Sequence, residues 1–131
     1  MSKAPLRSVM YVDDEPDIRE VVEMSLGLVA DLAVHTADSG ERALAQLPRV
    51  RPDMVLLDVM MPGMDGPTTL ARMRAQPELA SIPVVFMTAK AMPQEIARFI
   101  EMGAAAVISK PFDPMTLGAQ VVKVWEGLAR G

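Results

Sequence analysis

Residues 52–66 read PDMVLLDVMMPGMDG, and they carry the strongest indication of the fold class. An apolar run from Met54 to Leu57 ends in the carboxylate of Asp58, and the turn-forming pair Pro62-Gly63 follows. A short continuous apolar run predicts a strand that is buried on both faces, as in a parallel sheet. At the carboxyl end of such a strand, Asp58 would lie where open α/β sheets bind their ligands. A loop-capping role would explain Asp58 equally well, so the residues that reach the same edge decide between the two.

Four other segments around this run have the length and composition of strands, and segments with helical spacing separate them. Strands that alternate with helices indicate βαβ crossovers and therefore a parallel sheet. The sequence thus predicts a three-layer α/β fold, a doubly wound (βα)5 arrangement with helices on both faces of a five-stranded sheet. The expected strands are residues 8–12, 32–37, 54–57, 82–87 and 106–108. The expected helices are residues 16–29, 39–47, 66–75, 96–102 and 114–128.

The first and last of these helices indicate which side chains should face the core. In the first, apolar residues recur at helical spacing, and Arg19, Glu20 and Glu23 are expected to face water. The positions expected to be buried are Ile18, Val21, Val22, Ser25, Leu28 and Val29. In the last helix they are Leu117, Val121, Val124 and Leu128. Val122 and Trp125 fall outside that stripe, so they either form an exposed patch for a partner or pack against the domain itself.

Length and composition restrict the class of protein. The chain has 131 residues, half of them hydrophobic, so we expect one globular domain over residues 1–131 with a core from about 6 to 128. The net charge of -4 argues against nucleic-acid binding, which requires a basic surface. The sequence has no cysteine, no apolar signal segment at its start, and no apolar run of the roughly 20 residues that a membrane span needs. We therefore expect a cytoplasmic protein without a membrane span.

Charged and polar side chains follow four of the five expected strands. Asp13 and Asp14 follow the first strand, Asp58 the third, Thr88 the fourth and Lys110 the fifth. Since the carboxyl ends of parallel strands share one edge of the sheet, these side chains are expected to form one pocket. Three carboxylates repel each other unless a cation lies between them, and Mg²⁺ prefers such oxygen ligands. With this cation and Lys110 present, Asp58 can stay ionised and act as a nucleophile toward a phosphoryl group.

The residues at these strand ends resemble the response-regulator receiver domain of two-component signalling. The resemblance covers essentially the whole chain and rests on four motifs in the family's order. They are Asp13-Asp14-Glu15-Pro16, residues 58–66 (DVMMPGMDG), Thr88-Ala89 and Lys110-Pro111-Phe112. Each motif alone is a weak signal, but all four at strand ends are specific. The resemblance implies the flavodoxin-like strand order 2-1-3-4-5 and a cis peptide bond between Lys110 and Pro111.

The resemblance also implies a role for each residue of the pocket. Asp58 would accept the phosphoryl group, Lys110 would pair with the phosphoryl oxygens, and Thr88 would donate its hydroxyl to one of them. Mg²⁺ would be held by Asp13, Asp14, Asp58 and the backbone carbonyl of Met60. In that set Asp14 would bind the ion directly, and Asp13 largely through water.

The resemblance further implies partners rather than a small-molecule substrate. The phosphoryl group would come from a sensor histidine kinase or a histidine phosphotransfer domain, docked on residues 16–22 and Pro111-Phe112. The output would be a switch in binding to a downstream protein, through the surface of the fourth helix, fifth strand and fifth helix. The chain would be a monomer or weak dimer. It would not be an enzyme acting on other molecules, although it would assist its own phosphorylation and dephosphorylation.

Two alternatives remain open at this point. The chain could be a pseudo-receiver that binds partners without phosphorylation, although all five pocket residues are present. It could also be an aspartyl-phosphate phosphatase of the haloacid dehalogenase type. That chemistry needs a second acid two residues after the nucleophile, where this sequence has Met60.

A few positions depart from the family's usual pattern or tune it. Val107 stands where receivers often carry an aromatic residue that turns inward, a swing that a β-branched side chain cannot make. We therefore expect the signal to pass through the loop and helix around residues 88–96. Met60 and Lys90 stand where the family controls the access of water, so changing them is expected to alter the lifetime of the phosphorylated form. His35, in mid-strand, is expected to be structural rather than a ligand.

Overall fold

The computed structural model describes residues 4–128 and contains a five-stranded, wholly parallel sheet. The strand order β2-β1-β3-β4-β5 confirms the expected fold class. The predicted domain covers residues 1–131, and its ends, residues 1–3 and 129–131, lie outside the described residues. Strand β4 starts two residues later than expected, because Pro83 has no N–H to donate to a neighbouring strand. The strands are β1 (Ser8–Val12), β2 (Ala33–Ala37), β3 (Met54–Asp58), β4 (Val84–Thr88) and β5 (Ala106–Ser109).

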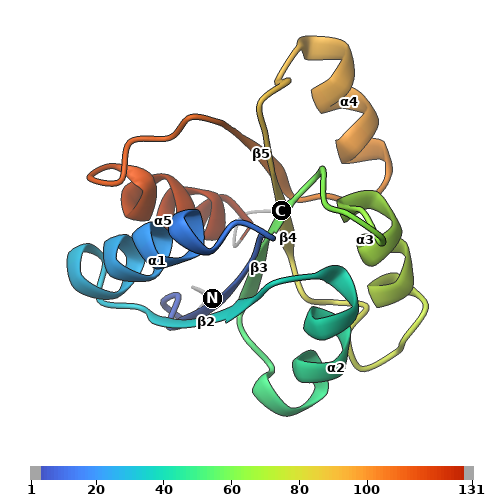
Figure 1. Ribbon diagram of the computed structural model, residues 1–131, viewed down its shortest axis with the longest axis horizontal. Helices are drawn as coiled ribbons and strands as arrows, with labels where there is room; N and C mark the ends of the chain where they lie inside the picture. Colours follow the sequence, from blue (N-terminus) through green and yellow to red (C-terminus); the bar gives the residue numbers. More distant parts are fainter. Residues whose placement is uncertain (1–3, 129–131) are drawn as a thin grey trace.

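Helices cover both faces of the sheet (Figure 1). The first and last helices lie on one face, and the three helices between them lie on the other. Side chains fix where two of the helices begin: the Ser39 hydroxyl accepts from the N–H of Arg42, and the Asp65 carboxylate accepts from the N–H of Thr68. The helices are α1 (Pro16–Met24), a short π-helix η1 (Ser25–Val29), α2 (Gly40–Val50), α3 (Gly66–Arg74), α4 (Pro93–Glu101) and α5 (Leu117–Leu128).

Each face of the sheet buries its own apolar core, because side chains alternate along a strand. On β3, Leu56 packs in the core beneath α1 and α5, whereas Leu57 packs in the core beneath α2, α3 and α4. All five residues of β3 and all five of β4 are buried. The central strands are therefore held on both sides, and they fix the positions of the residues at their carboxyl ends.

The first helix differs in part from the expectation. Val21 and Leu28, both expected to be buried, are 40% and 79% exposed. Val21 lies at the edge of the buried stripe, and η1 makes a wider turn that rotates the side chains after Met24 away from α-helical spacing. The side chain of Val29, also expected in the core, lies outside those that the structure describes. The side chains buried here are Val22, Ser25 and Leu26.

The structure of the last helix shows whether Trp125 is exposed for a partner or packs against the domain. This side chain is only 8% exposed, and its Nε1 donates a hydrogen bond of 2.8 Å to the carbonyl of Ala4. Trp125 therefore packs against the domain itself. Leu117 and Val121 are buried as expected, whereas Val124 is only half-buried. The helix begins at residue 117 rather than 114, because residues 114–116 form a turn.

Candidate functional site

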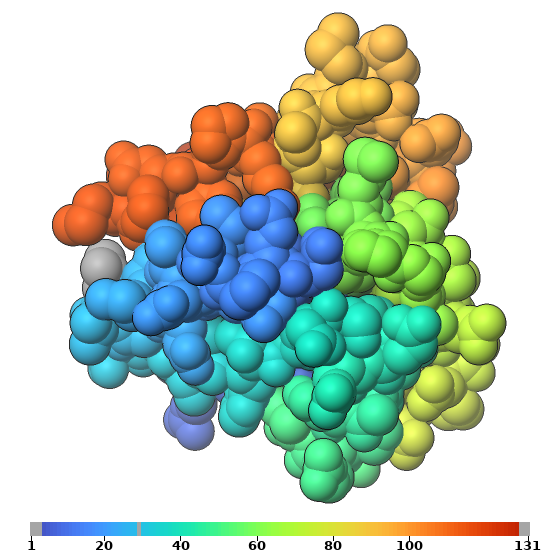
Figure 2. Space-filling model, in the orientation of Figure 1, coloured from blue at the N-terminus to red at the C-terminus, as the bar shows by residue number. Residues whose placement is uncertain are grey.

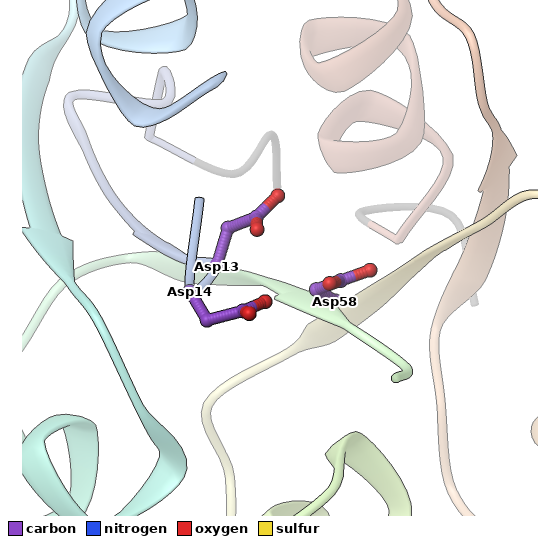
Figure 3. A group of neighbouring side chains, drawn as sticks. All are labelled: Asp13, Asp14 and Asp58. Atoms are coloured by element: carbon purple, nitrogen blue, oxygen red, sulfur yellow. The ribbon is translucent and has the colours of Figure 1, made fainter. Parts of the chain in front are cut away.

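Three carboxylates meet at the carboxyl edge of the sheet (Figure 3). Asp58 is the last residue of β3, and Asp13 and Asp14 follow β1, which pairs with β3. One oxygen of each carboxylate lies within 4.8 Å of the others. Asp13 is fully buried and Asp58 is 7% exposed, whereas Asp14 is the most exposed of the three. The structure thus brings together the three acids that the sequence placed at this edge, and we call them the acidic cluster.

Lys110 follows β5 and reaches across to this cluster. Its Nζ lies 2.9 Å from Asp58 Oδ1 and 3.2 Å from Asp13 Oδ2. Burial acts to lower the pKa of the Lys110 amine, but the hydrogen bond with Asp58 and the charge of Asp13 outweigh it and raise that pKa above its ordinary value. The side chain is therefore a fixed cation. The peptide bond between Lys110 and Pro111 is cis, as expected.

The pKa of Asp58 is raised above its ordinary value. Burial is the largest cause, and the negative charges of Asp13 and Asp14 act in the same direction. The hydrogen bond and the positive charge of Lys110 oppose them without cancelling them. Keeping Asp58 ionised in the folded protein therefore costs free energy. A further cation beside the carboxylates would reduce that cost.

Thr88 ends β4 and lies between the ends of β3 and β5. Its side chain is almost fully buried, and its carbonyl accepts a hydrogen bond of 2.8 Å from the N–H of Lys110. The N–H of Lys90 donates to Thr88 Oγ1 at 3.0 Å. A hydroxyl both accepts and donates, so this contact is compatible with donation by Thr88 to a phosphoryl oxygen.

The loop after β3 folds back closely against that strand. The N–H of Gly66 donates to the carbonyl of Val59 at 2.8 Å, and a Cβ at Gly66 would lie 2.6 Å from the Asp58 carbonyl oxygen. Glycine is therefore required for this close approach. Met60 in the same loop is 76% exposed, and it lines a groove of about 590 Å³ together with Phe99. Its backbone carbonyl as a metal ligand stays a prediction.

Two residues outside the predicted site, Tyr11 and Arg19, hold Asp13. The hydroxyl of Tyr11 donates to Asp13 Oδ2 at 2.6 Å, and burial, with this hydrogen bond, raises the pKa of Tyr11 far above its ordinary value. The Nη1 of Arg19 donates to the Asp13 carbonyl at 2.8 Å, so Arg19, which was expected to face water, is half-buried beside the cluster. The sequence could have placed Tyr11 near Asp13. It lies two residues before Asp13, and side chains two residues apart along an extended strand lie on the same face of the sheet.

The acidic cluster fits Mg²⁺. It offers three carboxylates, which are hard oxygen ligands, and Mg²⁺ commonly takes a small number of these and keeps several waters. Within residues 4–128 it is also the one group of three or more acidic or histidine side chains close enough together to hold an ion. His35 is exposed on the edge strand β2 and takes no part in it.

An apolar groove of about 400 Å³ runs from Lys110 along α1. Figure 2 shows α1 (blue) beside the segment that follows β5 (orange-red), and the Ser25 hydroxyl links the two by donating to the carbonyl of Pro114. Apolar residues that line the groove are Ile18, Val21, Phe112 and Pro114. Among the helices of the described residues, none combines the length and the apolar character needed to cross a membrane.

Known proteins that resemble this chain share one domain. The sequence profile of the response regulator receiver domain matches residues 9–122. The chain is 39% identical over 114 residues to response regulator Rre1 of Synechocystis sp., which covers 87% of this chain and 49% of Rre1. It is 37% identical to the DNA-binding response regulator MtrA of Mycolicibacterium smegmatis over 86% of this chain and 48% of MtrA. The chain thus spans about half the length of the curated relatives it matches.

Solved structures agree with these relatives. The chemotaxis response regulator CheY4 of Vibrio cholerae superposes with a TM-score of 0.84 at 32% identity, covering 91% of this chain and 98% of that one. The signal receiver domain of a histidine kinase from Syntrophus aciditrophicus superposes with a TM-score of 0.80 at 30% identity, covering 95% and 94%. The matched profile, the shared strand order and the similarity to these proteins show that the chain belongs to the response regulator receiver domain family of two-component systems.

Proposed function

We propose that Asp58 accepts a phosphoryl group from a phosphohistidine and that this switches the binding of a partner protein. The observation that carries the proposal is the setting of the Asp58 carboxylate. It lies at a strand end, 2.9 Å from the Lys110 ammonium and within a cluster of three acids. This carboxylate has the Lys110 cation beside it and two further carboxylates that would hold a second cation, and phosphoryl transfer depends on such charges to neutralise the phosphoryl oxygens.

In the proposed reaction, an Asp58 oxygen attacks phosphorus, and a P–O bond forms as the P–N bond to the donor imidazole breaks. The imidazole nitrogen leaves with the bonding electron pair and takes up a proton. Lys110 moves from Asp58 Oδ1 to a phosphoryl oxygen, and the hydroxyl of Thr88 donates to another. Bound by Asp13, Asp14, Asp58 and the Met60 carbonyl, Mg²⁺ would neutralise the charge of the acids and of the phosphoryl oxygens. Attack of water on phosphorus later restores the Asp58 carboxylate and releases phosphate.

The proposed donor is a sensor histidine kinase or a histidine phosphotransfer domain. The apolar groove between α1 and the Pro111-Phe112 segment begins at Lys110, so a helix docked there would bring a histidine close to Asp58. Val21, 40% exposed at the rim of this groove, offers apolar contact area. Val21→Glu is expected to reduce transfer from a kinase and to leave labelling by a small phosphodonor unchanged.

The proposed output surface is formed by α4, β5 and α5. The domain is proposed to act as one unit with a core over residues 6–128 and to be a monomer or weak dimer that modifies only itself. A cytoplasmic location stays a prediction. The pseudo-receiver and phosphatase alternatives receive no support from the similar proteins, which include response regulators and receiver domains.

The test is phosphorylation with acetyl phosphate and Mg²⁺, followed by intact-mass measurement. We expect a labile adduct of about 80 Da, the mass of one phosphoryl group, that disappears in Asp58→Asn and when Mg²⁺ is chelated. Asp38→Asn is the matched control, since Asp38 is an exposed aspartate that forms only a long ion pair with Arg42. An adduct that persists in Asp58→Asn would refute the proposal.

A further inference from the structure

A buried hydroxyl stands directly behind the acidic cluster. Tyr11 belongs to β1, is fully buried, and leaves the strand on the same face as Asp13. Its hydroxyl donates a hydrogen bond of 2.6 Å to Asp13 Oδ2, a length typical of hydroxyl donation to a charged carboxylate. The proposed function gives this tyrosine no part in the chemistry, so its hydroxyl needs another explanation.

Asp13 is held at every polar atom it has. Its carboxylate accepts at Oδ1 from the N–H of Glu15 at 3.0 Å, and at Oδ2 from both Tyr11 and Lys110. Its carbonyl accepts from Arg19 at 2.8 Å, and its N–H donates to Ala37 at 3.1 Å. The orientation of this carboxylate is therefore set before any ligand arrives.

One of these partners, Lys110, moves in the proposed reaction. Lys110 is shared between Asp13 Oδ2 at 3.2 Å and Asp58 Oδ1 at 2.9 Å, and the proposed reaction takes its ammonium to a phosphoryl oxygen. Asp13 is fully buried, and each hydrogen bond that its carboxylate loses leaves its orientation less well fixed. The Tyr11 hydroxyl is the donor that stays on Oδ2 when Lys110 leaves.

We propose that Tyr11 is a positioning residue of the phosphorylation site, whose hydroxyl holds Asp13 Oδ2 in place while Lys110 moves from Asp13 to the phosphoryl group. The inference rests on the proposed function of Asp58. Tyr11 touches neither the phosphoryl group nor its donor, and it acts through Asp13. When Lys110 leaves, the hydroxyl keeps the Asp13 carboxylate turned toward the other two acids.

Tyr11→Phe removes the hydroxyl and keeps the ring in the core. We expect phosphorylation by acetyl phosphate to slow about tenfold, the change in rate that a hydrogen bond to a charged group is worth. The matched control is Thr69→Val, which removes another buried hydroxyl, one that donates to the Asp65 carbonyl at 2.8 Å on the opposite face of the sheet. We expect this control to be phosphorylated at the wild-type rate.

A double-mutant cycle distinguishes positioning through Asp13 from general damage. In an Asp13→Ala background the Tyr11 hydroxyl has no carboxylate to hold, so adding Tyr11→Phe should change the residual rate less than twofold. Equal slowing by Tyr11→Phe in both backgrounds, or equal slowing by Thr69→Val, would overturn the proposal.

A spectroscopic measurement on the metal-free protein needs no phosphorylation at all. Tyr11 is the only tyrosine, so ring-labelled tyrosine gives a single ¹³Cζ resonance that reports the hydrogen bond of its hydroxyl. We expect that resonance to shift in Asp13→Ala and to keep its hydrogen-bonded position in Lys110→Met. An unshifted resonance in Asp13→Ala contradicts the role of Tyr11. If the wild type takes up no phosphoryl group at Asp58, the proposed function fails instead, whatever the resonance shows.

Discussion

The acidic cluster and the region around α4 differ in how firmly their side chains are held. In the cluster, Asp13 and Lys110 are each fixed by two or more partners at hydrogen-bond distance. In α4 only Phe99 is buried, and the helix extends away from the body of the domain in Figure 1. Apolar residues in and beside this helix stay in water: Met92 is 56% exposed, Ile100 44% and Met102 42%. The proposed chemistry would thus use strand ends that the sheet holds in place, whereas the proposed response would use a helix with few buried contacts, which can shift at low cost.

Among the variants considered, we expect the greatest loss of phosphorylation rate from a change within the acidic cluster and Lys110. Lys110→Met removes a cation that contacts both Asp13 and Asp58, so phosphorylation by acetyl phosphate should slow by about 100-fold, as when a positioned donor to a reacting oxygen is lost. The rate of adduct formation by intact mass is the readout, and Lys123→Met, on the exposed face of α5, is the control. A rate within twofold of the wild type would show that the contacts of Lys110 with Asp13 and Asp58 do not contribute to the reaction.

Metal binding should stabilise the same region. An ion that binds the folded state and not the unfolded state raises the free energy of unfolding by about 2.7 kcal/mol at a concentration 100 times its Kd. Urea unfolding with and without Mg²⁺ measures this gain, and Asp14→Asn should remove most of it, because Asp14 is the most exposed acid of the cluster and the proposed direct ligand. A gain that survives Asp14→Asn would place the ion elsewhere.

The raised pKa of Asp58 has a consequence for stability in the absence of metal. Because the pKa of the folded state lies above the unfolded value of 3.8, the folded protein binds its proton more tightly, and this contribution to stability is lost as pH rises through the folded pKa. Asp58→Asn removes the buried charge, so it should raise the melting temperature at neutral pH and give less advantage in acid. A melting temperature that falls at neutral pH would mean that the ion pair with Lys110 outweighs burial.

Smaller effects are expected at the border between the two regions. Met60 and Lys90 lie in the loops after β3 and β4, and both side chains are exposed to the water that would attack the phosphoryl group. Met60→Asn and Lys90→Ala are each expected to change the lifetime of the phosphorylated protein by severalfold, while phosphorylation itself continues. Decay of the adduct, followed by mass after the donor is removed, gives the lifetime. Unaltered decay in both variants would rule out this role.

The smallest expected change concerns Val107 on β5. This residue is half-buried beside α4 and cannot swing as an aromatic side chain would, so the signal should pass through residues 88–96. Amide resonances of residues 88–96 are expected to move when a phosphoryl mimic binds, and to move equally in Val107→Ala. Loss of these shifts in Val107→Ala would assign the valine a part in the switch.

The sequence predicted the fold and the acidic cluster well because both depend on strand order and strand ends. Apolar runs such as residues 54–57 mark buried strands, and parallel strands bring Asp13, Asp58 and Lys110 to one edge. The rotation of Leu28 into water was not predictable, since helical spacing assumes a regular helix and η1 is not one. Tyr11 was missed for a different reason: on an apolar strand its ring suffices to explain it, and only the structure shows where the hydroxyl points.

Locating the acyl phosphate in the sequence shows whether Asp58 is the phosphoacceptor. Borohydride reduces a phosphorylated aspartate to homoserine, so treating the phosphorylated protein and sequencing its peptides by mass spectrometry identifies the modified position. We expect homoserine at residue 58 alone, with Asp13 and Asp14 unchanged. Homoserine at either of those two positions, or at none, would contradict the role of Asp58 as phosphoacceptor.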